Sequence, residues 1–181
     1  LDGGLRHTNG ILPTVANFQE EGFSQVFVPS INATEASLVE GITALPVDSL
    51  AQVVAHLRGE VPIESSLGGT PDIGGSSGEE GAPDLSHING QEHANLALVV
   101  APAGDRNLLM LGLPGSGKTL LARTLPSILP ALTHDEALDV TKIYSVGGLL
   151  PSSSPLIRQR PFRAPHYTIS NAGVVGGGRI P

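Results

Sequence analysis

The sequence contains no cysteine and no tryptophan, and only 3% of its 181 residues are aromatic. The absence of cysteine excludes disulfide bonds and thiolate metal sites, and it is typical of proteins of the cytoplasm. No apolar run reaches the roughly 18 residues that a membrane-spanning helix needs, so no membrane partner is expected. The chain also begins with leucine and not methionine. We therefore expect a cytoplasmic protein, of which this chain is a piece.

Basic residues are scarce in the first part of the chain. Residues 1–83 hold eleven acidic side chains against Arg6 and Arg58, a net charge of −9, whereas residues 84–181 hold six acidic and eight basic ones, a net charge of +2. An acidic segment repels the phosphates of nucleic acids, so the first part is a poor nucleic-acid surface. The asymmetry predicts two separate units.

Residues 1–60 alternate between helical and extended patterns. The signals predict a helix from Pro13 to Gly22, a strand over 25–28, a helix begun by a capping box of Asn32 and Glu35, a strand over 42–47 and a helix capped by Asp48. Residues 61–83 are rich in glycine, serine and proline and predict a flexible linker. We therefore expect an α/β unit over 1–60, a linker over 61–83 and a second unit over 84–181.

The second unit carries stronger signals. A helix is expected from Asn89 or Gly90 up to Pro102, and the apolar residues 107–111 predict a buried parallel strand. A helix from Gly117 is expected to end at Pro126, and a capping box of Thr133 and Glu136 predicts the start of another.

Between the predicted strand and the helix from Gly117 lies a complete G-x-x-x-x-G-K-[ST] pattern. Its residues are Gly112, Leu113, Pro114, Gly115, Ser116, Gly117, Lys118 and Thr119. The glycines let main-chain N–H groups approach phosphates closely, Lys118 supplies the positive charge that carries catalysis on the β- and γ-phosphates, and Thr119 offers a hydroxyl to Mg²⁺. The pattern predicts a phosphate-binding loop with ATP and Mg²⁺ as its ligands.

Three stretches, residues 84–94, 107–123 and 160–170, resemble the YifB/ComM family of magnesium-chelatase-like AAA+ ATPases, and residues 1–60 resemble its N-terminal domain. The resemblance implies an α/β fold: a partial unit like the Lon protease domain (ribosomal S5 domain 2-like), then the N-terminal part of a P-loop AAA+ parallel-sheet core. It also implies an ATP-driven motor acting on DNA in competence or recombination, of branch-migration type, assembled as a homo-hexameric ring. Gly90 and Gln91 resemble a pair that lies near the adenine; the alternative is an ordinary helix start.

Two other functions fit the same sequence features. A motor subunit of a magnesium-chelatase-type metal-insertion complex would share the core, and a nucleotide-dependent interaction module would bind ATP without turnover. A Ser–Lys peptidase is not expected, because no lysine precedes Lys118. The acidic pair that completes a Mg²⁺ shell in ATPases, called Walker B, is expected beyond Pro181. The chain by itself should therefore bind nucleotide and hydrolyse it poorly.

An arginine-rich stretch follows residue 157. Arg158, Arg160 and Arg163 with Phe162 have the chemistry for stacking on single-stranded DNA, or they form a solvated loop that pairs with acids of a neighbouring subunit. Tyr167 stands where the family usually has a second histidine, which weakens any metal or proton role for its neighbour His166. The six histidines show no metal-ligand spacing, so no histidine-bound metal is expected.

Overall fold

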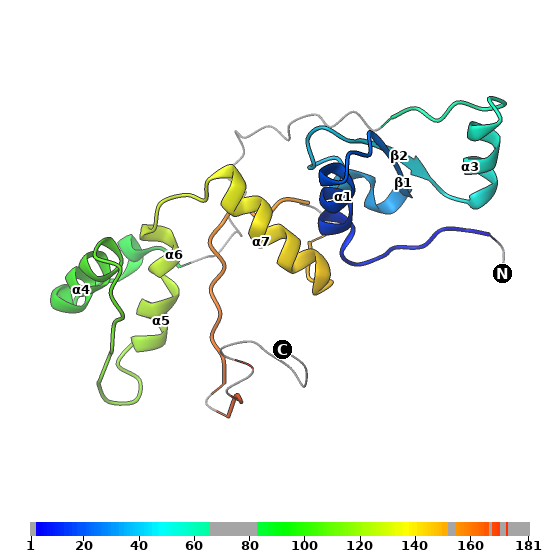
Figure 1. Ribbon diagram of the computed structural model, residues 1–181. Helices are drawn as coiled ribbons and strands as arrows, with labels where there is room; N and C mark the ends of the chain where they lie inside the picture. Colours follow the sequence, from blue (N-terminus) through cyan, green and yellow to red (C-terminus); the bar gives the residue numbers. More distant parts are fainter. Residues whose placement is uncertain (1–2, 66–82, 152–154, 167, 171–172, 174–181) are drawn as a thin grey trace. The chain divides into compact units, whose positions relative to one another are not determined.

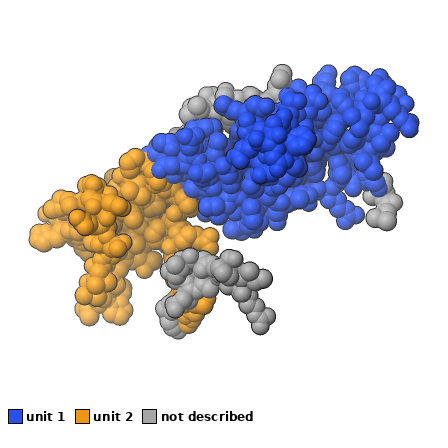
Figure 2. All heavy atoms as spheres, in the orientation of Figure 1, with its two compact units in different colours: residues 1–78, 131–159 blue, residues 79–130, 160–181 orange. Residues whose placement is uncertain are grey.

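The computed structural model describes residues 3–65, 83–151, 155–166, 168–170 and 173. The chain forms two compact units (Figure 2): the first unit comprises residues 1–78 and 131–159, and the second unit residues 79–130 and 160–181. The helices and strands (Figure 1) are, in chain order, α1 (Ile11–Glu20), β1 (Gln25–Pro29), the 3₁₀ helix η1 (Ser30–Asn32), α2 (Ala33–Ala36), β2 (Thr43–Val47), α3 (Leu50–Leu57), the 3₁₀ helix η2 (Leu85–His87), α4 (Glu92–Ala103), α5 (Lys118–Arg123), α6 (Leu125–Ile128) and α7 (His134–Val146). Within the described ranges, no helix is both long and apolar enough to cross a bilayer. Residues 66–82, most of the predicted linker, lie outside the described residues.

The first unit is built on a parallel pair of strands. β1 and β2 pair in register from Gln25 opposite Thr43 to Pro29 opposite Val47. Because parallel strands cannot be joined by a tight hairpin, the chain crosses between them through η1 and α2. Both strands fall where the sequence predicts them, and the fold of the unit is mixed α/β.

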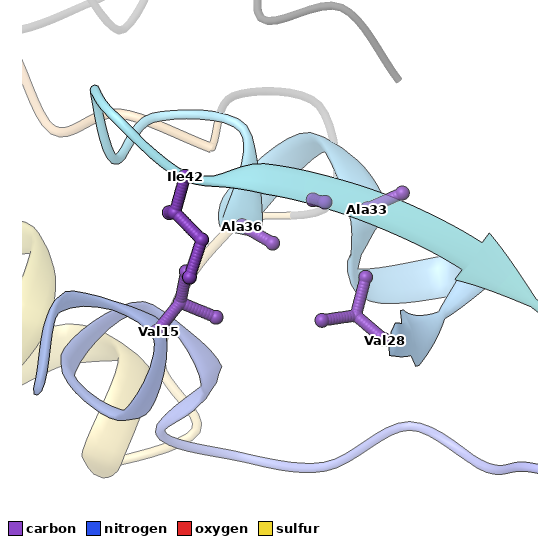
Figure 3. Close-up of a cluster of buried hydrophobic side chains, with 6 residues drawn as sticks. Val15, Val28, Ala33, Ala36 and Ile42 are labelled. Carbon is purple, nitrogen blue, oxygen red and sulfur yellow. The ribbon is translucent and has the colours of Figure 1, made fainter. Parts of the chain in front are cut away.

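A small apolar core holds these elements together (Figure 3). Side chains from α1, β1, α2, β2 and the residue before β2 meet in it, and each is at most 8% exposed: Val15, Val28, Ala33, Ala36, Ile42 and Ala44. Burying a valine or isoleucine side chain contributes about 1.5–3 kcal/mol of folding free energy. The core therefore fixes how α1 and α2 pack on the strands.

A buried carboxyl group joins α1, α2 and α7. Glu35, which is 7% exposed, accepts hydrogen bonds from the Leu12 N–H at 3.0 Å, from the Asn32 side-chain amide at 3.1 Å and from the Ser145 hydroxyl. The predicted capping box of Asn32 and Glu35 is therefore wrong, because no side chain caps α2. The N–H groups in the first turn of a helix lack partners inside it, and Glu35 satisfies one of them at the start of α1.

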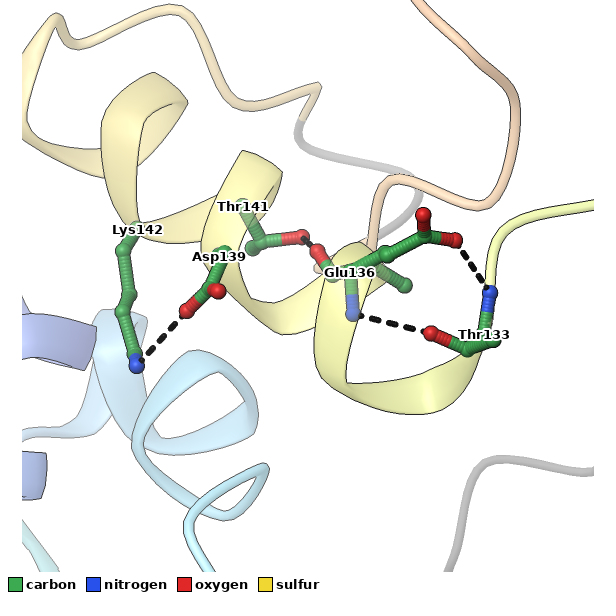
Figure 4. Close-up of polar contacts among 6 residues, drawn as sticks. Thr133, Glu136, Asp139, Thr141 and Lys142 are labelled. Atoms are coloured by element: carbon green, nitrogen blue, oxygen red, sulfur yellow. Dashed lines mark hydrogen bonds and ion pairs between the residues drawn. The ribbon is translucent and has the colours of Figure 1, made fainter.

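The start of α7 agrees with the sequence. The Glu136 N–H donates to the Thr133 hydroxyl at 3.3 Å, and the Thr133 N–H donates to the Glu136 carboxyl at 2.9 Å, so the predicted capping box is confirmed (Figure 4). Further along α7, the Lys142 ammonium lies 3.1 Å from the Asp139 carboxyl. Both interactions join residues three apart, and local signals of this kind can be read from the sequence.

The predicted cap of α3 is wrong by one residue. The Gln52 N–H donates to the hydroxyl of Ser49, not to Asp48, at 3.4 Å. The Asp48 N–H donates in turn to the Gln52 side-chain oxygen at 2.7 Å. Serine and aspartate cap equally well in general, so the sequence could not decide between these neighbours.

Two prolines in the second unit lie inside helices and do not end them. Pro102 lies in the last turn of α4, where the Arg106 N–H still reaches the Ala101 carbonyl at 2.9 Å and closes the helix end. Pro126 lies in the first turn of α6, where its missing N–H would have had no partner inside the helix. The helix α4 therefore ends one residue beyond Pro102, and α5 ends at Arg123, before Pro126.

The predicted buried strand over residues 107–111 is wrong for this structure. The segment has no regular secondary structure, and Leu109 and Leu111 are 81% and 86% exposed. A parallel strand requires neighbouring strands for its hydrogen bonds. Among the described residues, no strand pairs with this segment, and the only sheet is the pair β1–β2. The parallel-sheet core expected around the phosphate-binding pattern is thus absent from the described part of the second unit.

Candidate functional site

The segment that carries the G-x-x-x-x-G-K-[ST] pattern forms a tight loop in the second unit. The Ser116 N–H donates to the Leu113 carbonyl at 3.2 Å, which closes a four-residue turn. Pro114 and Gly115 occupy its two central positions, and Gly115 has a φ of 79°. Proline followed by a residue with positive φ is the sequence of a type II turn. The loop is therefore shaped by its own residues.

The three glycines of the pattern serve different purposes. Gly115 and Gly117, with φ values of 79° and 82°, adopt left-handed backbone conformations that other residues enter only with strain. A Cβ atom at Gly112 would lie 3.0 Å from the Ser116 hydroxyl oxygen and 3.8 Å from the Lys118 ammonium. A side chain at Gly112 would therefore crowd Ser116 and Lys118, whereas Gly115 and Gly117 allow the backbone to turn.

The Lys118 ammonium folds back over the loop. Its nitrogen lies 2.9 Å from the Gly112 carbonyl oxygen, 2.7 Å from the Leu113 carbonyl oxygen and 3.2 Å from the Ser116 hydroxyl oxygen. Lys118 is the first residue of α5, and Gly117 is its N-cap. All three acceptors are uncharged, so a phosphate oxygen offers this cation a stronger, charge-assisted partner.

Gln91 approaches the loop from the start of α4. Its side-chain amide donates to the Ser116 carbonyl at 2.9 Å. One turn into α4, the Asn95 side-chain amide donates to the Gly90 carbonyl at 3.2 Å. The predicted pair Gly90–Gln91 is thus brought to the phosphate-binding pattern across 25 residues of sequence. No local sequence pattern signals the Gln91–Ser116 contact, because it depends on how α4 and the loop pack.

Thr119 lies in the first turn of α5 and is exposed. Its hydroxyl oxygen is a suitable ligand for Mg²⁺, which prefers oxygen donors and usually keeps several other ligands from phosphates and water. Within the described ranges, no three acidic or histidine side chains gather into a metal-binding group. The described part of the chain therefore offers a divalent cation one threonine hydroxyl beside the loop, and no group of three acidic or histidine ligands.

The arginines beyond residue 157 are divided between the units. Arg158 belongs to the first unit, and Arg160 and Arg163 to the second. The Arg160 guanidinium donates to the Pro130 carbonyl at 2.8 Å, and Phe162 is 38% exposed. Tyr167 lies outside the described residues. The structure therefore anchors Arg160 to the main chain.

A hollow in the first unit lies away from these residues. It has a volume of about 460 Å³ beside α3 and is lined by Pro46, Asp48, Ala51, Gln52, Ala55, Val61, Pro62 and Ile63. Its one charged side chain is the carboxyl of Asp48, which repels phosphates. This hollow is not a phosphate site.

The sequence is similar to a known protein family and to several longer proteins. Residues 84–181 match the family described as magnesium chelatase, subunit ChlI. The chain is 44% identical over 178 residues to an uncharacterized protein of Mycobacterium tuberculosis, covering 98% of this chain and 34% of that protein. It is 37% identical over 183 residues to competence protein ComM of Haemophilus influenzae (100% and 35%) and 35% identical over 188 residues to YifB of Escherichia coli (100% and 34%). The chain thus spans about a third of the length of these relatives.

Proposed function

The chain belongs to the magnesium chelatase ChlI-like family, in its YifB and ComM group, and we propose that residues 112–119 bind ATP with Mg²⁺ to drive a motor that acts on DNA. Residues 84–181 are a region of an AAA+ ATPase of this family. The identity of the nucleotide and metal, the motor activity and the DNA partner are the parts that we propose.

The position of the Lys118 ammonium carries the proposal. It lies within hydrogen-bonding distance of the Gly112 and Leu113 carbonyls, inside a loop whose turn is closed by its own main chain. A triphosphate would offer charged oxygens in place of these neutral acceptors, and Lys118 would move to them as a mobile point charge. The N–H groups that the first turn of a helix leaves without partners would face the same anion.

Mg²⁺ would be held by the Thr119 hydroxyl together with phosphate oxygens. When bound, the metal neutralises charge that develops on the β- and γ-phosphates. The chain's own contribution is to fix the phosphates through the loop and to place the hydroxyl of Thr119 beside them. The other ligands would come from water, nucleotide and later parts of the protein.

The surroundings of the loop support a larger core. Residues 107–111 lead directly into Gly112 and expose leucines that a sheet would bury. In the intact protein we expect this segment to pair as the strand before the phosphate loop, within the parallel-sheet core of an AAA+ domain. Residues 1–60 would then form part of a Lon-like N-terminal domain and residues 61–83 the linker.

The loop is tested by exchanging the lysine in the intact protein. Lys118→Ala removes the only charge that the described loop offers to phosphate, and two lost charge-assisted hydrogen bonds correspond to about 100-fold weaker ATP binding. Lys142→Ala is the matched control, because the chain has only these two lysines and Lys142 pairs with Asp139 on α7. Calorimetric titration with Mg-ATP measures both. An unchanged dissociation constant in Lys118→Ala would defeat the proposed site.

The DNA motor rests on the likeness to competence protein ComM, and a metal-insertion motor is favoured instead by the family's magnesium chelatase description. In the intact hexameric ring, forked or junction DNA should raise the rate of ATP turnover. A rate that stays flat with every DNA added would favour the metal-insertion subunit. Tight ATP binding with no turnover under any condition would favour a nucleotide-dependent interaction module.

A further inference from the structure

Gln91 has an unusual backbone. Its φ and ψ are 54° and 44°, in the left-handed region, and it follows Gly90, whose φ is 79°. Within the described ranges, Asp105 is the only other non-glycine residue with positive φ. A residue with a Cβ enters this region only with strain, so something in the surroundings must hold Gln91 there.

The side chain of Gln91 does not cap its own helix. Gln91 is the N-cap of α4, and no side-chain hydrogen bond caps that helix. Serine, asparagine or glycine would suit an N-cap better than glutamine. The amide instead donates to the Ser116 carbonyl in the phosphate-binding loop, at 2.9 Å. The position therefore carries a residue that is poor for the helix and makes a contact with the loop.

Ser116 is held from three directions. Its N–H donates to the Leu113 carbonyl, its hydroxyl accepts from the Lys118 ammonium at 3.2 Å, and its carbonyl accepts from Gln91. The peptide plane that joins Ser116 to Gly117 is rigid, and in a trans peptide the C=O and the next N–H point in opposite directions. By holding the Ser116 carbonyl, Gln91 also sets the direction of the Gly117 N–H.

We propose that Gln91 is a positioning residue for the phosphate loop: its side-chain amide holds the Ser116–Gly117 peptide so that the Gly117 N–H is presented to bound phosphate. The left-handed backbone at Gly90 and Gln91 is what turns the side chain toward the loop. This inference rests on the proposed nucleotide site. It differs from an adenine contact because it acts on every ligand that carries the phosphate chain, whatever its base.

The test compares ligands with different bases and with none. In the intact protein, Gln91→Met keeps the length of the side chain and removes the donor. We expect affinities for Mg-ATP, Mg-GTP and Mg-tripolyphosphate to fall by the same factor, up to about tenfold for one hydrogen bond. Gln19→Met is the matched control, because Gln19 lies exposed on α1 in the first unit. A loss for ATP alone, with tripolyphosphate unchanged, would overturn the proposal, as would no loss at all.

A second variant separates positioning from stability. Gln91→Gly removes the amide and also relieves the strain at φ 54°. Its melting temperature should therefore not fall, while its affinity for tripolyphosphate should fall as in Gln91→Met. Wild-type affinity in Gln91→Gly would show that the amide is dispensable and sink the inference. If the wild-type protein binds neither ATP nor tripolyphosphate, the proposed function fails instead, which is a different result from either variant's.

Discussion

The two units differ in what holds them together. In the first unit, contacts between residues far apart in sequence bury a shared core. Glu35 contacts Leu12 at the start of α1 and also accepts a hydrogen bond from Ser145, 110 residues further along the chain. In the second unit, Leu98 and Leu121 are the buried apolar side chains among the described residues, while Leu109, Leu111 and several others are largely exposed. The loop 112–119 nevertheless has its turn, its glycine conformations and its lysine contacts. Because those interactions span at most six residues, the loop forms without the sheet expected beside it.

The largest expected effect comes from replacing one leucine by alanine in each of the two units. Leu12→Ala, at 0% exposure in the first unit, should lower the free energy of unfolding by about 3–4 kcal/mol, because it leaves a cavity. Leu109→Ala, at 81% exposure in the second, should change it by less than about 0.5 kcal/mol. Urea denaturation of the 181-residue chain measures both. Equal losses would show that the second unit has a core of its own.

Repeating Leu109→Ala in the intact protein sharpens the comparison. If residues 107–111 form a buried strand there, the same substitution should cost about 2 kcal/mol or more. A cost that stays negligible would mean that the segment remains exposed, and the proposed parallel-sheet core would then have to form without it.

An intermediate effect is expected at the carboxyl group that ties the first unit together. Glu35→Gln replaces one of two acceptor oxygens with an NH₂ group facing donors from Leu12, Asn32 and Ser145. Leaving a buried donor without an acceptor should cost about 2 kcal/mol of unfolding free energy. Glu40→Gln, at an exposed site on the same part of the chain, is the control.

Ser145→Ala tests whether Glu35 and Ser145 stabilise the first unit through the same hydrogen bond. It should cost about 1 kcal/mol alone, and less in the Glu35→Gln background, since both changes remove the same hydrogen bond. Strictly additive losses, measured by thermal or urea unfolding, would show that Glu35 and Ser145 act independently and that α7 is held by its apolar face alone.

The same division explains what could be read from the sequence. β1, β2 and the capping box at Thr133 were predictable because their signals lie within a few residues. The spacing of Asn32 and Glu35 also matches a capping box, yet Glu35 bonds to α1 and α7, which no local pattern encodes. The segment 107–111 has strand composition but no partner, and a strand is not a local structure.

The candidate site divides in the same way. The loop from Gly112 to Thr119 could be located completely, and its turn type follows from Pro114 and Gly115. The partner of Gln91 could not be predicted, because it depends on a left-handed backbone that glutamine rarely adopts and on contact with a loop 25 residues away. The residues of the loop can be located from the sequence alone, whereas the contacts that position the loop depend on tertiary packing.

The smallest effect is expected at Asp84, the N-cap of η2 in the second unit. Hydrogen bonds from the Ser86 side chain and then from the Ser86 N–H hold the pKa of this partly exposed carboxyl below its ordinary value, and the nearby His87 lowers it further. A depressed pKa means that the cap stabilises η2 above the unfolded-state value near 4 and that this contribution is lost as the pH falls through the lower folded-state value. NMR titration of the Asp84 carboxyl carbon should give a midpoint below that of the urea-unfolded chain, and Ser86→Ala should move it back toward the unfolded value. A midpoint equal to the unfolded one would mean that η2 is not capped in solution, and that the local order of the second unit is confined to the loop 112–119 and the longer helices.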